Sequence, residues 1–174
     1  NLDKRIDPAL LVEGARSVVV CAISYNRPPA AGVASRIASY ARGRDYHPAL
    51  KEKLHELLAY IRDLHPGTSG RVFVDTAPIL EKSWAAEAGV GRIGRHSLLI
   101  VPGLGSFVVL GLIVTDAELE PDPPFLAPDP CGSCRACIEA CPVGAIGNDR
   151  TIDASLCISR RTIEAEAGDE GDLH

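Results

Sequence analysis

Hydrophobic residues recur at helical spacing in one long segment of the chain. Most of them stand three or four residues apart, at Leu50, Leu54, Leu57, Leu58, Ile61 and Leu64. This spacing predicts an amphipathic helix that lays one face on a core. Asp45 supplies a start signal before the segment, and Pro66-Gly67 ends it.

Shorter apolar runs predict β-strands at residues 16–23, 71–74, 97–101 and 106–114. The first run is nearly continuous and β-branched, which is typical of a buried parallel strand and puts Cys21 in the core. Turn-forming residues at 102–105 join the last two runs, so we expect a hairpin or a paired edge there.

The order of these elements predicts the fold class. Residues 81–89 follow the 71–74 strand as a second helix closed by Gly89. Strand, helix, strand, helix in this order indicates a right-handed α/β unit with a mostly parallel sheet and flanking helices. Residues 30–44 are rich in Ala, Gly, Ser and Arg, and we expect either a helix or a loop that crosses the sheet.

Composition divides the chain into parts. Residues 119–130 are rich in proline and acidic residues, as linkers are, and separate a domain at 1–118 from a cysteine module at 131–164. Residues 165–174 are read as an acidic solvated tail. The net charge of −5 excludes a globally basic nucleic-acid-binding surface but leaves a local patch open.

The sequence shows neither a membrane-spanning segment nor a signal peptide. No apolar run approaches the roughly 18 residues of a membrane span, so we expect no membrane partner. No signal peptide is visible, and the chain opens without Met, so we expect the natural start to lie upstream.

The cysteines carry the strongest chemical signal. Four of the six fall within residues 131–141 in the pattern C-x2-C-x2-C-x3-C-P, with Pro142 at its end: Cys131, Cys134, Cys137 and Cys141. This spacing is typical of a bacterial-ferredoxin [4Fe–4S] site, with three thiolates on one cluster and the fourth on another. A four-cysteine zinc site is the alternative, although zinc ligands usually come as two separated pairs. Such density favours metal ligation in a reducing compartment, hence the cytoplasm.

Two [4Fe–4S] clusters need more thiolates than this chain offers. Cys157 adds a fifth ligand, while Cys21 lies in a predicted core strand. We therefore expect a second cysteine motif beyond His174 in the natural protein.

Several ordered motifs resemble the epoxyqueuosine reductase family, the cobalamin-dependent iron–sulfur enzymes of queuosine tRNA modification. The resemblance covers about residues 5 to 164 and is carried by residues 7–8, 14–18, 40–47, 74–82, 91–96, 105–107 and 110–111, the cysteine run, and residues 153–154, 157–159 and 162–164. It implies a cobalamin-binding α/β domain related to that of reductive dehalogenases, the start of a two-cluster ferredoxin module, and a helical-repeat tail that this chain lacks.

The resemblance also implies roles for particular residues. Asp75 matches the proton donor beside the corrinoid, and Tyr46 with His47 matches polar residues that line the active site. Cofactor contacts are expected from Arg95, His96, Ser97, Leu98 and Arg160, and Cys157 would join Cys141 on the second cluster. Arg160 and Arg161 depart from the apolar or aromatic residues expected there.

Simpler interpretations remain open for these residues. Asp75 could instead be a turn residue, because the sequence Asp75-Thr76-Ala77-Pro78 favours a turn. Tyr46 and His47 could simply form the first turn of a helix. Arg160 could be a solvated surface residue. Gly89, Gly91 and Gly94 match G-x-G-x-x-G, but they follow a predicted helix, so we assign them to close approach of a corrinoid or substrate rather than of NAD.

The resulting hypothesis is reduction of epoxyqueuosine to queuosine in a tRNA anticodon loop. Electrons would pass from an external donor through [4Fe–4S] clusters to cobalamin, in a cytoplasmic monomer. The alternatives are a ferredoxin-like electron carrier and a corrinoid-dependent reductase of another substrate.

Overall fold

The computed structural model describes residues 2–27, 37–123 and 128–163. Its contacts divide the chain into two compact units, one of residues 1–92 and 99–127 and one of residues 93–98 and 128–174. The predicted acidic tail at 165–174 lies outside the described residues. Within the described part, no helix is both long enough and apolar enough to span a membrane.

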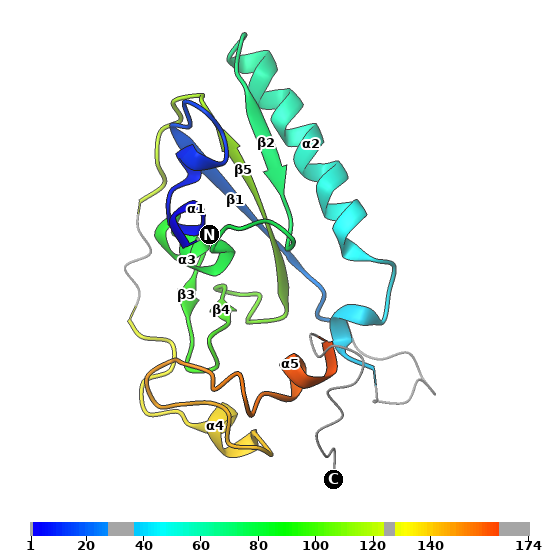
Figure 1. Cartoon of the computed structure of the whole chain (residues 1–174), viewed down its shortest axis with the longest axis vertical. Coiled ribbons are helices and arrows are strands. Elements are labelled where there is room, and N and C mark those ends of the chain that lie inside the picture. Colours follow the sequence, from blue (N-terminus) through cyan, green and yellow to red (C-terminus); the bar gives the residue numbers. More distant parts are fainter. Residues whose placement is uncertain (1, 28–36, 124–127, 164–174) are drawn as a thin grey trace. The chain divides into compact units, whose positions relative to one another are not determined.

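The first unit is built on a three-stranded sheet, shown in Figure 1. Its strand order is β1 (Ser17–Ser24), β5 (Val108–Thr115), β2 (Gly70–Phe73). β5 pairs antiparallel with both neighbours, with Val19 opposite Ile113 on one side and Val72 opposite the same residue on the other. β1 and β2 therefore run in the same direction on either side of it.

The predicted mostly parallel sheet is wrong for this unit. A helical crossover does join β1 to β2 and does leave them parallel to each other, as the order of elements predicts. However, β5 inserts between them in the opposite direction and takes all their ladder hydrogen bonds. The fold is a mixed α/β arrangement in which the described strand pairs of this sheet are antiparallel.

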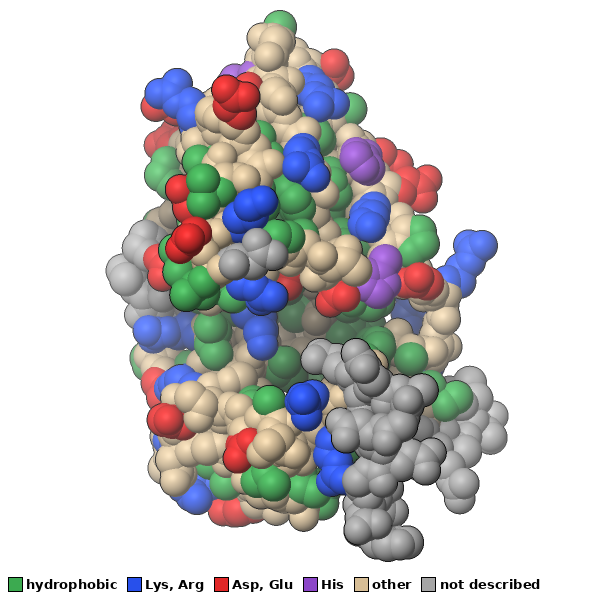
Figure 2. Space-filling model, in the orientation of Figure 1, with side chains coloured by type: hydrophobic (Ala, Val, Ile, Leu, Met, Phe, Trp, Pro, Cys, Tyr) green, Lys and Arg blue, Asp and Glu red, His purple; other side chains and the backbone are tan. Residues whose placement is uncertain are grey.

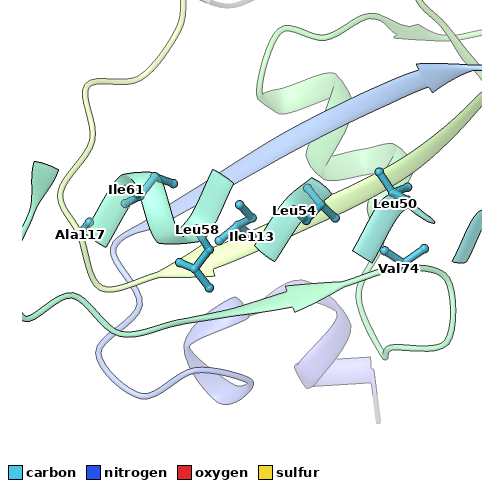
Figure 3. Packing of buried hydrophobic residues seen from close by; sticks show 7 residues of the cluster. All are labelled: Leu50, Leu54, Leu58, Ile61, Val74, Ile113 and Ala117. Carbon is cyan, nitrogen blue, oxygen red and sulfur yellow. The ribbon is translucent and has the colours of Figure 1, made fainter. Parts of the chain in front are cut away.

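Helix α2 (Tyr46–Leu64) covers one face of the sheet, and Asp45 caps it by accepting a hydrogen bond from the His47 N–H over 2.9 Å. The predicted helix and its start are confirmed. Figure 3 shows the cluster that joins α2 to the sheet, made of Leu50, Leu54, Leu58, Ile61, Val74, Ile113 and Ala117. Gly111 allows this approach, because a Cβ there would lie 2.5 Å from Leu54 Cδ1.

Helix α3 (Glu81–Glu87) and the N-terminal segment pack on the opposite face. The segment contains α1 (Leu2–Ile6) and the short 3-10 helix η1 (Pro8–Leu10). A second cluster holds this layer to the sheet through Val12, Phe73, Ile79, Leu112 and Val114, with Trp84 against it. β5 is thus covered on both faces, which explains its continuous apolar run without requiring parallel neighbours.

The predicted hairpin between residues 97–101 and 106–114 is also corrected. β4 (Leu99–Ile100) pairs with β3 (Arg92–Ile93), while β5 enters the main sheet. The turn between them closes on itself through a bridge from Val101 to Gly105. Of residues 30–44, the described part forms the 3-10 helix η2 (Ser39–Ala41).

Turns dominate the second unit. Its helices are short, α4 (Ala136–Ala140) and α5 (Ile158–Ile163), and one isolated bridge pairs Ile146 with Ile152. Asp129, Asp149 and Asp153 each accept a hydrogen bond from the backbone N–H two residues ahead. Such turns order the chain locally with little apolar burial.

Candidate functional site

The N-terminus of α2 presents His47 between two carboxylates. His47 Nδ1 lies 2.6 Å from Asp45 Oδ1, and its Nε2 lies 3.4 Å from Asp75 Oδ2. The hydrogen bond with Asp45 is the main cause of a raised pKa for His47; burial opposes it, and the Asp75 carboxylate adds to it. Asp45 therefore both caps the helix and orients the imidazole toward Asp75.

Asp75 stands in the loop between β2 and α3. Its φ of 57° lies in the left-handed region, which few residues other than glycine adopt. The side chain is 60% exposed, so the carboxylate is open to a ligand. Asp in turns also adopts this backbone conformation, so what distinguishes Asp75 is the His47 imidazole 3.4 Å from its carboxylate.

Tyr46 lies against the same group. Its ring stacks on the His47 imidazole with 4.0 Å between ring centroids. Burial, helped by the charge of Asp75, raises the pKa of Tyr46 to about 12, so its hydroxyl stays protonated at neutral pH. The structure thus brings together the three residues predicted for the active site, Asp75, Tyr46 and His47.

Glu81 joins this group although the sequence did not point to it. It is the first residue of α3, and its Oε1 is buried without a hydrogen-bond partner. Burial raises the pKa of Glu81 to about 7. The negative charge of Asp75 also raises this pKa, whereas the backbone N–H of Asp75 lowers it. An acidic residue in a first helical turn is ordinary, so no local sequence signal marked this one.

Apolar side chains are exposed at the end of β1 and at the start of β5. Ile23, Tyr40 and Phe107 are 38%, 41% and 47% exposed. Tyr25 joins them through edge-to-face contacts with Tyr40 and Phe107, at 6.4 and 5.8 Å between centroids. These side chains form an exposed apolar patch at this edge of the first unit.

The cysteine module directs backbone N–H groups at two of its sulfurs. Arg95 N–H donates to Cys131 Sγ, and Ala145 N–H donates to Cys141 Sγ, each over 3.3 Å. Hydrogen bonds from the N–H groups of Val143 and then Ala145 lower the pKa of Cys141. These contacts stabilise thiolates, the form that binds iron.

The donor set suits an iron–sulfur cluster. All six cysteines are free thiols, including Cys134, Cys137 and Cys157 in this unit. Within residues 2–27, 37–123 and 128–163, no three His, Cys, Asp or Glu side chains are gathered closely enough to hold a single metal ion. A [4Fe–4S] cluster does not require that closeness, because each cysteine binds a different iron.

The segment predicted to contact the cofactor belongs to the cysteine unit. The Arg95 guanidinium donates to the carbonyl oxygens of Gly132, over 2.6 Å, and Asn148, over 3.3 Å. Ser97 Oγ donates to the Arg150 carbonyl, and Leu98 N–H donates to His96 Nδ1 over 3.2 Å. Arg95 and Ser97 thus bind the cysteine loop, and the corrinoid contacts of residues 95–98 stay predictions.

Arg160 lies on α5, one helical turn after Cys157, with its side chain exposed. Its proposed role as a cofactor contact stays a prediction. Figure 2 shows Lys and Arg side chains interspersed with Asp and Glu on the face in view. That face has the mixed charge expected from a net charge of −5.

Comparison with known proteins finds two protein families whose models match parts of the chain. "Epoxyqueuosine reductase QueG, DUF1730" matches residues 5–76, and "4Fe-4S double cluster binding domain" matches residues 130–171. The curated epoxyqueuosine reductase of Cellulophaga algicola is 43% identical over 165 residues, covering 94% of this chain and 53% of the relative. The chain therefore spans about half the length of that relative.

Solved structures agree in fold and name. The epoxyqueuosine reductase of Streptococcus thermophilus superposes with a TM-score of 0.87 at 32% identity, over 96% of this chain and 46% of that one. An epoxyqueuosine reductase solved with an epoxyqueuosine-modified tRNA-Tyr stem loop gives a TM-score of 0.83 at 34% identity, over 91% and 44%. Over more than nine tenths of its own length, the chain is thus similar to epoxyqueuosine reductases.

Proposed function

We propose that the protein containing this chain reduces epoxyqueuosine to queuosine in tRNA, with Asp75 as the proton donor. The observation that carries the proposal is the open Asp75 carboxylate, on a left-handed backbone and 3.4 Å from His47. An acid that must reach a bound substrate needs exposure together with a fixed orientation, and this pair combines both.

The neighbours of Asp75 would prepare it for that reaction. His47, oriented by Asp45, would hold the Asp75 carboxyl group in place through the 3.4 Å contact between His47 Nε2 and Asp75 Oδ2. Tyr46, whose hydroxyl stays protonated, would donate a hydrogen bond to a substrate oxygen. The departing oxygen of the epoxide would take its proton from Asp75.

We propose cobalamin and two [4Fe–4S] clusters as the cofactors. Bound together, they supply the electrons for the reduction. Cys131, Cys134, Cys137, Cys141 and Cys157 would be cluster ligands in a ferredoxin-type module at 131–164. The exposed apolar edge around Phe107 suits the face of a corrin ring, and Arg95, His96, Ser97, Leu98 and Arg160 stay the proposed polar contacts. Residues 1–118 would then form the cobalamin-binding domain, with 119–130 as the linker.

The proposed substrate is the modified base in a tRNA anticodon loop. A relative of this fold was solved with such a stem loop. Unpaired loop bases can be turned out of a stack, which suits a recessed site. An external electron donor, a monomeric state and a cytoplasmic location complete the proposal, since the tRNA substrate and reducing conditions are found there.

The test uses the enzyme expressed from its complete reading frame. After anaerobic reconstitution with iron, sulfide and cobalamin, epoxyqueuosine tRNA and a strong reductant are added, and the digested nucleosides are analysed by mass spectrometry. We expect the modified base to lose the mass of one oxygen. Asp75→Ala should abolish this conversion while cobalamin stays bound.

Asp63→Ala is the matched control, because Asp63 is an exposed carboxylate of α2 and should leave conversion unchanged. Clusters and cobalamin in place without any nucleoside change would refute the tRNA assignment. Clusters that form without cobalamin binding would instead favour a ferredoxin-like electron carrier.

A further inference from the structure

The proposed reaction needs more protons than Asp75 holds. Converting an epoxide to an alkene breaks both carbon–oxygen bonds, forms a carbon–carbon double bond and releases the oxygen as water. The balance requires two electrons, here from the external donor, and two protons. Asp75 holds one proton at a time, so the second bond-breaking step needs Asp75 to be reprotonated, from solvent or from a neighbouring acid.

Glu81 is the carboxyl group best placed to be that acid. The backbone N–H and the carboxylate of Asp75 both act on the pKa of the Glu81 carboxyl group, which begins α3 directly after the loop that presents Asp75. Glu81 Oε1 is buried and has no hydrogen-bond partner within the described residues. An ionised oxygen in that position would be costly, whereas a protonated one removes the charge.

The charged and titratable groups that face Glu81 come from three elements. Asp75 faces it from the loop after β2, Tyr46 from α2, and Lys82 from its own helix. The Asp75 carboxylate disfavours a second negative charge, the protonated Tyr46 hydroxyl is neutral, and the Lys82 ammonium weakly favours the charge. Burial has the largest effect and raises the pKa of Glu81 to about 7, so it holds an exchangeable proton at neutral pH.

We propose that Glu81 is a positioning residue that fixes the Asp75 loop and returns a proton to Asp75 during each turnover. This inference rests on the proposed function. The first carbon–oxygen bond breaks as Asp75 protonates the oxygen. Glu81 then protonates Asp75, and the second bond breaks as Asp75 gives this proton to the leaving hydroxyl, which departs as water. Both carboxylates recover their protons from solvent.

The test compares two variants of the reconstituted full-length enzyme. Glu81→Gln keeps a carbonyl oxygen for the Asp75 N–H but has no ionisable proton. We expect kcat to fall roughly 10- to 100-fold with KM for tRNA unchanged. In the wild type, kcat should fall as pH rises through about 7, and this inflection should be absent from Glu81→Gln. Glu87→Gln, an exposed glutamate at the other end of α3, should match the wild type in both respects.

A second readout does not depend on turnover. The carboxyl carbon of Glu81, assigned from the difference between wild-type and Glu81→Gln spectra of 13C-glutamate-labelled enzyme, should titrate near pH 7. Asp75→Asn should lower that midpoint by removing a facing charge. Glu81→Asp keeps a proton and should retain more activity than Glu81→Gln, which separates proton transfer from loop packing.

The proposed role of Glu81 would be overturned if Glu81→Gln kept the kcat and the pH inflection of the wild type. It would also be overturned if the Glu81 carboxyl carbon titrated at the pH of an ordinary glutamate. If the wild-type enzyme converts no nucleoside at all, the proposed function fails and the relay fails with it. Conversion by the wild type together with an unaffected Glu81→Gln would leave the proposed function standing and reject the relay alone.

Discussion

The two units of this chain are ordered by different forces. The first buries two apolar clusters against opposite faces of β5, where Leu112, Ile113 and Val114 have no exposed surface. In the described part of the second, Ala145 is the buried member of the hydrophobic core, and local turns and hydrogen bonds to sulfur provide most of the order. We therefore expect a module so poor in apolar burial to depend on a bound cluster for stability.

This difference suits the roles proposed for the two units. A strained, exposed Asp75 requires a rigid support, which the two-sided core of the first unit provides. The cysteine loop needs only to hold its sulfurs around a cluster, and N–H groups directed at Cys131 and Cys141 do so with few side chains. Stability in one unit comes from the chain, and in the other we expect it to come from the cofactor.

Removing the cluster should produce the largest effect. Cys137→Ala should eliminate cluster absorption and conversion of epoxyqueuosine, and it should expose the amides of residues 128–163 to rapid hydrogen exchange. Amides of β5 should keep their protection. Cys21→Ala is the control, because Cys21 lies in β1 and packs on the α2 cluster. If the amides of residues 128–163 stayed protected from exchange without iron, the cysteine module would not depend on its cluster, and the contrast between the two units would fail.

Weakening the apolar core should have a smaller effect, and it should destabilise the first unit while leaving the cysteine module intact. Leu54 is 1% exposed, and Leu54→Ala should lower the free energy of unfolding of the first unit by roughly 3 kcal/mol. Trp84, the one tryptophan of the chain, packs in this unit and reports its unfolding by fluorescence. Cluster absorption should persist at denaturant concentrations at which the Trp84 signal has already changed, and simultaneous loss of both signals would show that the units unfold together.

Replacing Glu81 should change stability in a pH-dependent way and by the smallest amount. Its pKa is 4.5 as an unperturbed carboxyl and about 7 in the folded protein, so folding favours the protonated form. That stabilisation is complete below about pH 4.5 and is lost as pH rises through 7. Glu81→Gln should therefore match the wild type at pH 4 and exceed it by about 1 kcal/mol at pH 8, after allowance for solvent screening.

Chemical denaturation at the two pH values, followed by Trp84 fluorescence, measures this difference. Glu87→Gln should show no such dependence. Equal destabilisation of Glu81→Gln at both pH values would mean that the carboxyl group contributes through packing and not through its proton.

Local patterns were sufficient for the elements that carry their own signal. The leucine spacing and Asp45 predicted α2, the apolar runs predicted the regions of β1, β2 and β5, and the cysteine spacing predicted the iron–sulfur module. The ordered motifs predicted the resemblance to epoxyqueuosine reductases, which the comparisons then confirmed. Each of these features depends on residues close together in the chain, where periodicity and spacing act directly.

Strand direction and the environment of Glu81 were outside the reach of such patterns. A continuous apolar run reports that a strand is covered on both faces, but it carries no information on which way the neighbouring strands run. Likewise, Glu81 reads as a common first-turn acid until the folded chain removes water from its Oε1 and sets Asp75 beside it. The strands that pair with β5 are distant from it in sequence, and the burial of Glu81 Oε1 depends on how the chain folds around it. The three-dimensional arrangement was therefore needed to show both features.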